Sequence, residues 1–267
     1  MQTKLISIIV VALNPGEKLK ETLDSIKMQT YKNYEVIIKD GGSADGSVSS
    51  VKERPGQKIV VEKDAGIYDA MNRAAELGSG EYVYFLNCGD TFSDEKVLRD
   101  VASFIDEKKA EKGIYYGNIF ERLTGKTVTS NPDLNAFGCY RNVPCHQACF
   151  YKRELVLAHP FQLNYRVRAD YEQFLWCFFE GGARTVFMDR LIADYEGGGF
   201  SETKENRKRS AAEHKEIVHK YMSRGQIFKY KTIMWITLAP LRTRLAQSEK
   251  TAGIYNGLKR FLYRLGK

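Results

Sequence analysis

Four apolar runs constrain the fold of this chain more than any other feature. The first, LISIIVVAL over Leu5–Leu13, is an unbroken and largely β-branched stretch, which is typical of a strand buried on both faces. Three shorter runs have the same character and are predicted to form strands: Tyr34–Lys39, Ile59–Glu62 and Glu81–Leu86. A strand buried on both faces requires cover on both sides of its sheet, and helices usually provide it.

The segments between these runs carry apolar residues at helical spacing. Leu19, Leu23 and Ile26 lie three to four residues apart, and the same spacing recurs over residues 67–77 and 97–105. Strands that alternate with amphipathic helices predict an α/β fold with a mostly parallel central sheet flanked by helices. The apolar start of the chain shows no cleavage site, so we interpret it as the first strand and not as a signal peptide.

Three of the four predicted strands are followed by a carboxylate. These acids are Asp40, Asp64 and Asp90, the last of them in the stretch YFLNCGD. Right-handed crossovers bring the carboxyl ends of such strands to one edge of the sheet, where open α/β sheets bind their ligands. One acid in this position is explained by an ordinary turn. Three acids on one edge indicate a ligand site.

Beyond residue 112 the pattern is looser. We expect short strands at Ile114–Phe120, Ala148–Tyr151 and Thr185–Met188, a polar loop at Arg141–Gln147, and a charged amphipathic helix over residues 203–224. The five cysteines are odd in number and scattered, which favours reduced thiols. Cysteines near residue 145 raise the possibility of zinc, but no C-x-x-C pair supports a metal cluster.

The net charge of +8 is distributed unevenly along the chain. Residues 1–202 hold 25 Lys/Arg and 29 Asp/Glu, a net charge of −4, whereas residues 203–267 hold 16 Lys/Arg and 4 Asp/Glu, a net charge of +12. Within this basic tail, the apolar segment TIMWITLAPL at residues 232–241 is too short to span a membrane. With the similar stretch at residues 258–265 it predicts binding to an anionic membrane surface. The alternative is a helical appendage that packs on the main domain or on a second subunit.

Three segments together resemble family 2 glycosyltransferases. They are DGGSADGS at Asp40–Ser47, EKDAGIYDAMN at Glu62–Asn72 and GEYVYFLNCGD at Gly80–Asp90. The similarity is close over residues 4–105 and looser beyond. It implies a GT-A fold, with a catalytic domain at 1–202 (nucleotide-binding half 1–112, acceptor half 113–202) and a basic helical appendage at 203–267. It also implies a nucleotide-sugar donor, a divalent metal (Mn²⁺ or Mg²⁺) and inversion at the anomeric carbon.

The resemblance assigns roles to the residues at the predicted sheet edge. It implies that the donor nucleotide binds at Leu13, Asp40, Gly41, Asp64 and Asn72, and that Asp90 is the last acid of the family's metal motif. The chain departs from that motif, because Asn87 and Cys88 stand where relatives carry further acidic residues. Metal binding then depends largely on the diphosphate of the donor. A tight turn remains the alternative role for Asp40.

A catalytic base is expected on the second half of the chain. Asp170 in ARADYEQF resembles the base of the family, and its alternative role is that of a helix N-cap. Glu172 is the reserve candidate. The segment PCHQACFY resembles a part of the family that lies on the acceptor or donor side, which points to His146 and Gln147; the alternative is a loop histidine without such a role.

These observations predict an inverting glycosyltransferase that moves a hexose or N-acetylhexosamine from a nucleoside-diphosphate sugar, with UDP expected, to a hydroxyl of a glycan or lipid-linked glycan. The enzyme is expected in the cytoplasm, peripheral at the inner membrane, without a nucleic-acid partner and with a homodimer left open. Two alternatives are a sugar nucleotidyltransferase and a non-catalytic relative that binds phosphate or membranes. The first lacks support because ALNPGEKL follows the first strand in place of a basic Gly-rich loop.

Overall fold

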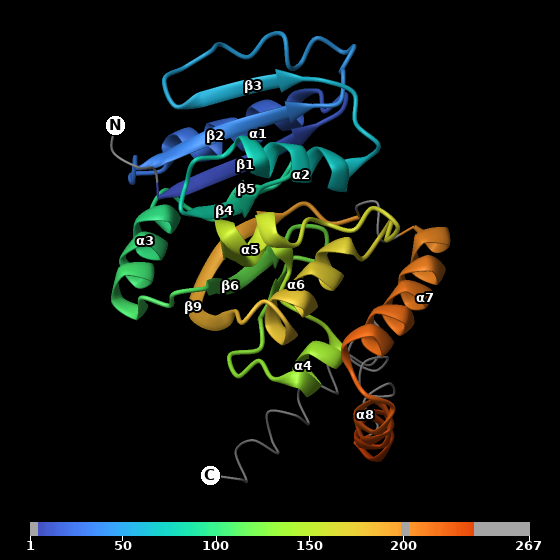
Figure 1. Cartoon of the computed structure of the whole chain (residues 1–267). Helices are drawn as coiled ribbons and strands as arrows, with labels where there is room; N and C mark the ends of the chain where they lie inside the picture. Colours follow the sequence, from blue (N-terminus) through green and yellow to red (C-terminus); the bar gives the residue numbers. More distant parts are fainter. Residues whose placement is uncertain (1–4, 199–202, 238–267) are drawn as a thin grey trace. The chain divides into compact units, whose positions relative to one another are not determined.

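A computed structural model describes residues 5–198 and 203–237 of the chain. Its centre is a nine-stranded sheet in the order β3-β2-β1-β4-β8-β6-β9-β5, with β7 paired to β6 (Figure 1). The four predicted N-terminal strands form its parallel part: β1 (Ile6–Ala12), β2 (Tyr34–Asp40), β3 (Gln57–Val61) and β4 (Tyr82–Phe85). The prediction of an α/β fold with a mostly parallel sheet is confirmed.

The remaining strands form a mixed part of the same sheet. They are β5 (Thr91–Phe92), β6 (Gly113–Glu121), β7 (Lys126–Val128), β8 (Cys149–Lys152) and β9 (Arg184–Tyr195). Strand β8 runs antiparallel between β4 and β6, whereas β9 pairs parallel with β6. The short strands β5 and β7 were not predicted, and β9 extends well beyond the predicted residues 185–188.

Helices cover both faces of the sheet. The three predicted in the first half are α1 (Glu17–Met28), α2 (Ile67–Leu77) and α3 (Val97–Lys108). The second half adds α4 (Ala136–Arg141), α5 (Arg153–Ala158) and α6 (Ala169–Phe179), with a 3-10 turn at His146–Ala148. Helices α4 and α5 were not predicted, because six residues are too few to show a clear helical period.

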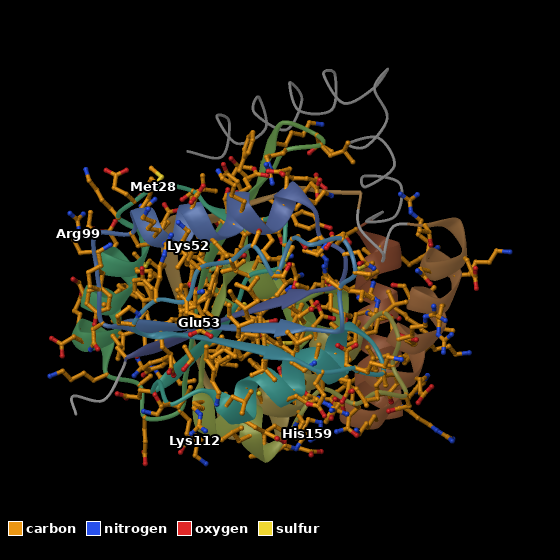
Figure 2. The ribbon with its side chains drawn as sticks, turned by 90° about the horizontal axis from the view of Figure 1, so that it is seen from above. Met28, Lys52, Glu53, Arg99, Lys112 and His159 are labelled. Carbon is orange, nitrogen blue, oxygen red and sulfur yellow. The ribbon has the colours of Figure 1, made fainter. Side chains whose placement is uncertain are left out.

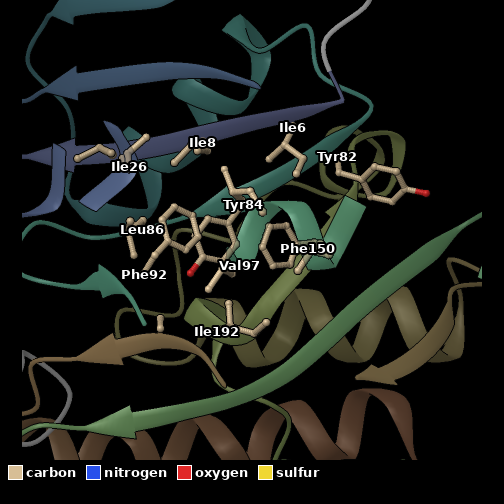
Figure 3. Close-up of a cluster of buried hydrophobic side chains, with 14 of the residues drawn as sticks. Ile6, Ile8, Ile26, Tyr82, Tyr84, Leu86, Phe92, Val97, Phe150 and Ile192 are labelled. Carbon is tan, nitrogen blue, oxygen red and sulfur yellow. The ribbon is translucent and has the colours of Figure 1, made fainter. Parts of the chain in front are cut away.

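The alternating side chains of the buried strands supply two cores. Ile6, Ile8 and Tyr84 pack with residues of α1 and α3 in one continuous cluster (Figure 3). On the other face, Phe85 packs against Phe161, with ring centroids 5.2 Å apart, and the backbone of Phe161 is hydrogen-bonded to Asn72 of α2. A view from above labels Met28 on the α1 side and His159 on the opposite side (Figure 2). Both faces of the central strands are therefore buried, as the unbroken apolar runs predicted.

Helix α7 (Lys204–Tyr221) fixes the segment that leads into α6. The buried Glu213 carboxylate accepts backbone N–H hydrogen bonds from Arg166 at 3.0 Å, Val167 at 3.0 Å and Arg168 at 2.9 Å. The chain divides into two compact units after Ile217, so the first unit includes most of this helix, whereas the predicted appendage begins at residue 203.

The second unit contains α8 (Arg224–Ile236), which begins at a capping box formed by Ser223 and Gln226. Phe228, Trp235 and Ile236 are exposed on this helix. Among the helices that the structure describes, none is both long and apolar enough to cross a membrane. The predicted interfacial stretch at 258–265, and part of that at 232–241, lie outside the described residues.

Replacing Glu213 with alanine is expected to destabilise the first unit, because three N–H groups lose their common acceptor. We expect the free energy of unfolding in urea to fall by about 2–3 kcal/mol. Glu216→Ala is the matched control, since Glu216 accepts one hydrogen bond, from the Tyr165 hydroxyl at 2.9 Å. The loss of stability in this control should be about 1 kcal/mol. Equal losses in the two variants would contradict this account of α7.

Candidate active site

Asp90 lies in a tight turn after β4, where it is almost completely buried. Its Oδ2 accepts a hydrogen bond from Gln147 Nε2 at 2.9 Å, and its Oδ1 accepts one from the Glu196 N–H at 2.9 Å. The Thr22 hydroxyl on α1 donates to the Asp90 carbonyl at 2.8 Å, which links this turn to α1. Burial raises the pKa of Asp90, and the two donors and nearby positive charge offset only part of that rise.

The same turn contains an oxygen without a hydrogen-bond partner in the described structure. Asn87 Oδ1 is buried and unsatisfied, although the Asn87 Nδ2 lies 3.1 Å from His146 Nε2. A buried amide oxygen without a partner is costly and calls for an explanation. The described residues hold no group of three or more His, Cys, Asp or Glu side chains arranged as a metal site. Asp90 and Asn87 therefore offer one carboxylate and one amide oxygen, which are ligands of the type that Mg²⁺ and Mn²⁺ prefer.

Asp170 occupies the second position of α6, because the N-cap of that helix is Arg168. The N-cap alternative for Asp170 is thus wrong. Its Oδ1 accepts the Tyr171 N–H at 2.9 Å and the Tyr68 hydroxyl at 3.1 Å, and its Oδ2 lies 3.5 Å from His146 Nδ1. Burial by itself raises the pKa of the Asp170 carboxyl, but His146 and these donors together hold the pKa below its usual value. Asp170 is therefore ionised at neutral pH, as a general base must be.

Two consecutive residues connect Asp90 and Asp170. His146 contacts Asp170 and Gln147 contacts Asp90, so one 3-10 turn holds both acids. The Tyr84 hydroxyl donates to the Gln147 carbonyl at 2.8 Å, and the Cys145 thiol donates to Gln147 Oε1 at 2.6 Å, which aims Nε2 at Asp90. His146 and Gln147 thus each contact one of the two acids, and His146 is not a loop histidine without such a contact.

Asp40 ends β2 beside the end of β1, with Ala12 as its partner in the parallel register. Its carboxylate accepts the Ser43 N–H at 2.9 Å and the Ser43 hydroxyl at 2.5 Å, and the residue is 1% exposed. The side chain therefore closes the turn that follows β2. This is the turn role that the sequence left open for Asp40, and its binding to the nucleotide stays a prediction.

Asp64 packs directly against Gly41. A methyl group on Gly41 would come within 2.9 Å of Asp64 Oδ2 and 3.4 Å of Leu13 Cδ1, so these three residues form one wall. Behind it, the completely buried Lys39 ammonium lies 3.5 Å from Asp64 Oδ2. Leu13 is 64% exposed, which is unusual for a leucine at the end of a core strand. Leu13, Gly41 and Asp64 thus lie together, and their binding to the nucleotide stays a prediction.

Two predicted residues are engaged elsewhere. Asn72 Nδ2 donates to the Phe161 carbonyl at 2.9 Å while its Oδ1 accepts the Phe161 N–H at 2.8 Å. Its amide thus ties α2 to the segment after α5, which is a structural role and not a donor contact. Glu172 is fully buried and lies 3.0 Å from His159 Nε2, so the structure does not bring this reserve candidate to the site.

Two basic residues near Asp90 were missed from the sequence. Lys18 on α1 lies 2.7 Å from the carboxylate of Glu196, whose N–H binds Asp90. Arg122, after β6, donates to the Gly89 carbonyl and pairs with Glu21 at 2.6 Å. Both are far from Asp90 along the chain and lie in stretches with no motif, so no sequence pattern pointed to either of them.

Asp170 also lines a cavity of about 790 Å³ on the side of the second half of the chain. Residues of β7, α4, the loop before the 3-10 turn and the segment before α6 form its walls.

Comparisons with known proteins identify the family of the chain. The profile described as "Glycosyl transferase family 2" matches residues 7–190. The chain is 35% identical over 210 residues to a PGL/p-HBAD biosynthesis glycosyltransferase of Mycobacterium bovis, covering 76% of this chain and 81% of the relative. It is 30% identical over 149 residues to the Escherichia coli UDP-Glc:alpha-D-GlcNAc-diphosphoundecaprenol beta-1,3-glucosyltransferase WfaP, covering 53% and 59%.

Among solved structures, Staphylococcus aureus TarS 1-349 in complex with UDP-GlcNAc is similar with a TM-score of 0.65 and 18% identity. The similarity covers 83% of this chain and 69% of that one, and it shows the fold. Together with the family profile and the edge of acids at the parallel strands, it leads to one assignment: the chain is an enzyme that belongs to glycosyltransferase family 2 and has the GT-A fold.

Proposed function

We propose that the enzyme transfers one sugar, with inversion, from a UDP-sugar to a hydroxyl of a lipid-linked glycan. The observation that carries this proposal is the turn at His146-Gln147, which contacts an ionised carboxylate, Asp170, through His146 and a buried one, Asp90, through Gln147. An inverting transfer needs a base for the acceptor and a charge-stabilising group for the leaving diphosphate, on opposite sides of the anomeric carbon.

Asp170 is the base in this proposal. It accepts the proton of the acceptor hydroxyl while that oxygen forms a bond to the anomeric carbon and the bond to the nucleoside diphosphate breaks. Its ionised state is supported by the lowered pKa of its carboxyl. The Tyr68 hydroxyl and His146 fix the orientation of the carboxylate toward the cavity.

A divalent cation fits the Asp90 turn as an oxygen-ligated metal. Asp90 and the unsatisfied Asn87 Oδ1 would hold it, with the remaining ligands from the donor diphosphate and water. Such a cation stabilises negative charge on the departing diphosphate. Lys18 and Arg122 add positive charge beside the same turn.

The nucleotide is assigned to the wall formed by Leu13, Gly41 and Asp64. The absence of a side chain on Gly41 leaves room for the Asp64 carboxylate beside it, and Asp64 is an acceptor for ribose or base N–H and O–H groups. UDP is favoured because TarS was solved with UDP-GlcNAc and the name of WfaP specifies a UDP-Glc donor. The name of WfaP also specifies a lipid-linked acceptor.

Nucleotide titration tests the donor site directly. UDP, GDP and dTDP are titrated into the purified enzyme with and without Mn²⁺. We expect UDP to bind in a Mn²⁺-dependent manner and Asp90→Ala to weaken this binding about tenfold or more, as the loss of a group that holds a metal does.

Asp106→Ala is the matched control, since Asp106 is exposed on α3 and its removal should leave the titration unchanged. Binding of UDP that is independent of Mn²⁺ in every variant would overturn the metal assignment. The failure of all three nucleotides to bind would overturn the transferase proposal itself.

We further propose that the second unit binds an anionic membrane surface on the cytoplasmic side. Residues 218–237 contain Lys220, Arg224, Lys229 and Lys231 and no acid, and α8 exposes Phe228 and Trp235. Basic residues beside exposed aromatic side chains are the composition of interfacial helices.

A vesicle-flotation assay tests this membrane proposal. The enzyme should float with vesicles that contain phosphatidylglycerol. With neutral vesicles it should stay in the bottom fraction. Replacing both Phe228 and Trp235 with serine should reduce the floating fraction several-fold. Equal flotation of the double variant and the wild type would reject α8 as the contact.

A further inference from the structure

Two arginines line the cavity that contains Asp170, and no carboxylate among the described residues forms an ion pair with either of them. Arg168 Nε donates to the Ser210 hydroxyl at 2.7 Å, and the guanidinium lies over the Tyr171 ring at 5.3 Å. The four N–H groups on its two terminal nitrogens have no partner among the described residues. Arg141, at the end of α4, makes no hydrogen bond or ion pair with any residue that the structure describes.

Three other arginines of the first unit each form an ion pair with a carboxylate. Arg122 pairs with Glu21 at 2.6 Å, Arg190 with Asp94 at 2.6 Å, and Arg209 with Glu213 at 3.0 Å. The charge of Arg168 also affects a neighbouring histidine. Burial lowers the pKa of His214, and the Arg168 guanidinium lowers this pKa further. A half-buried guanidinium held by a hydroxyl and a ring keeps its charge and its fork of donors for a ligand.

We propose that this cavity binds the acceptor through a phosphate group, which Arg168 and Arg141 hold while a hydroxyl of the acceptor faces Asp170. The inference rests on the proposed function and adds the chemical class of the acceptor. Planar guanidinium groups bind phosphate oxygens in pairs, which gives both affinity and orientation.

The negative charges in the cavity set a condition on this acceptor. Glu121 and Asp170 also line the walls, so a phosphate cannot occupy the same end as the base without repulsion. The acceptor is therefore expected to carry its phosphate apart from its reacting hydroxyl. A sugar 1-phosphate or a lipid diphospho-sugar whose reacting hydroxyl lies across the ring meets this condition.

The test uses the full-length enzyme with its donor site saturated by UDP and Mg²⁺, and bound UDP is quantified in every sample by equilibrium dialysis. Glucose 1-phosphate and citronellyl diphosphate are then titrated as probes, with glucose and citronellol as their neutral counterparts. We expect the phosphate probes to bind at least about tenfold more tightly than the neutral ones, as charge-assisted hydrogen bonds imply. Tighter binding of citronellyl diphosphate identifies a lipid diphosphate, and tighter binding of glucose 1-phosphate identifies a phosphate on the glycan.

Substitutions locate the phosphate. Arg141→Gln removes a charge without breaking a described contact, and it should weaken both phosphate probes about tenfold. Arg168→Gln should do the same, and Arg168→Lys keeps the charge as a check if the glutamine variant fails to fold. Arg184→Gln, which removes an exposed arginine outside the cavity, should change nothing.

Failure of this inference and failure of the proposed function give different results. If UDP binds but the phosphate probes bind no better than the neutral ones, or are insensitive to the Arg141 and Arg168 variants, the acceptor phosphate is ruled out while the transferase stands. If UDP does not bind, the proposed function falls and the acceptor assignment falls with it.

Discussion

The hydrogen bond from the Tyr84 hydroxyl to the Gln147 carbonyl supports the rest of the site. Tyr84 is completely buried in β4 between Phe92 and Phe150, with ring centroids 5.1 and 4.4 Å away, so its hydroxyl is fixed by the core. Through that bond the parallel part of the sheet holds a turn from the second half of the chain. The position of His146 and Gln147, and with it the spacing of the two acids, therefore follows from core packing.

The two acids have pKa values shifted in opposite directions, and their surroundings explain why. Burial dominates at Asp90 and raises the pKa of its carboxyl, whereas at Asp170 the imidazole, a backbone N–H and a phenol outweigh burial and lower it. A carboxylate whose ionisation is unfavourable gains most from a cation, and a carboxylate that stays ionised is ready to accept a proton. Environments that separate the pKa values of paired acids commonly mark divided roles.

The sequence predicted the parts of the fold and site that depend on local pattern. The four apolar runs became β1 to β4, and the acids that follow them meet at one edge because parallel strands require it. Contacts between distant segments could not be predicted from the sequence. No pattern linked Asn72 to Phe161 or Glu172 to His159, so Asn72 and Glu172 were both assigned to the site. Lys18, Tyr68, Arg122 and Arg168 were missed for the same reason, since each acts only through the fold.

The most direct test of this account is the pH dependence of donor hydrolysis by His146→Leu, with water as the acceptor and released UDP as the readout. Leucine removes the imidazole that lowers the pKa of Asp170 but leaves the burial that raises it. We predict that the acid limb of kcat moves to higher pH in this variant and stays in place in His219→Leu, which changes an exposed histidine. A reduced rate with an unmoved acid limb would contradict the claim that His146 holds Asp170 as the ionised base.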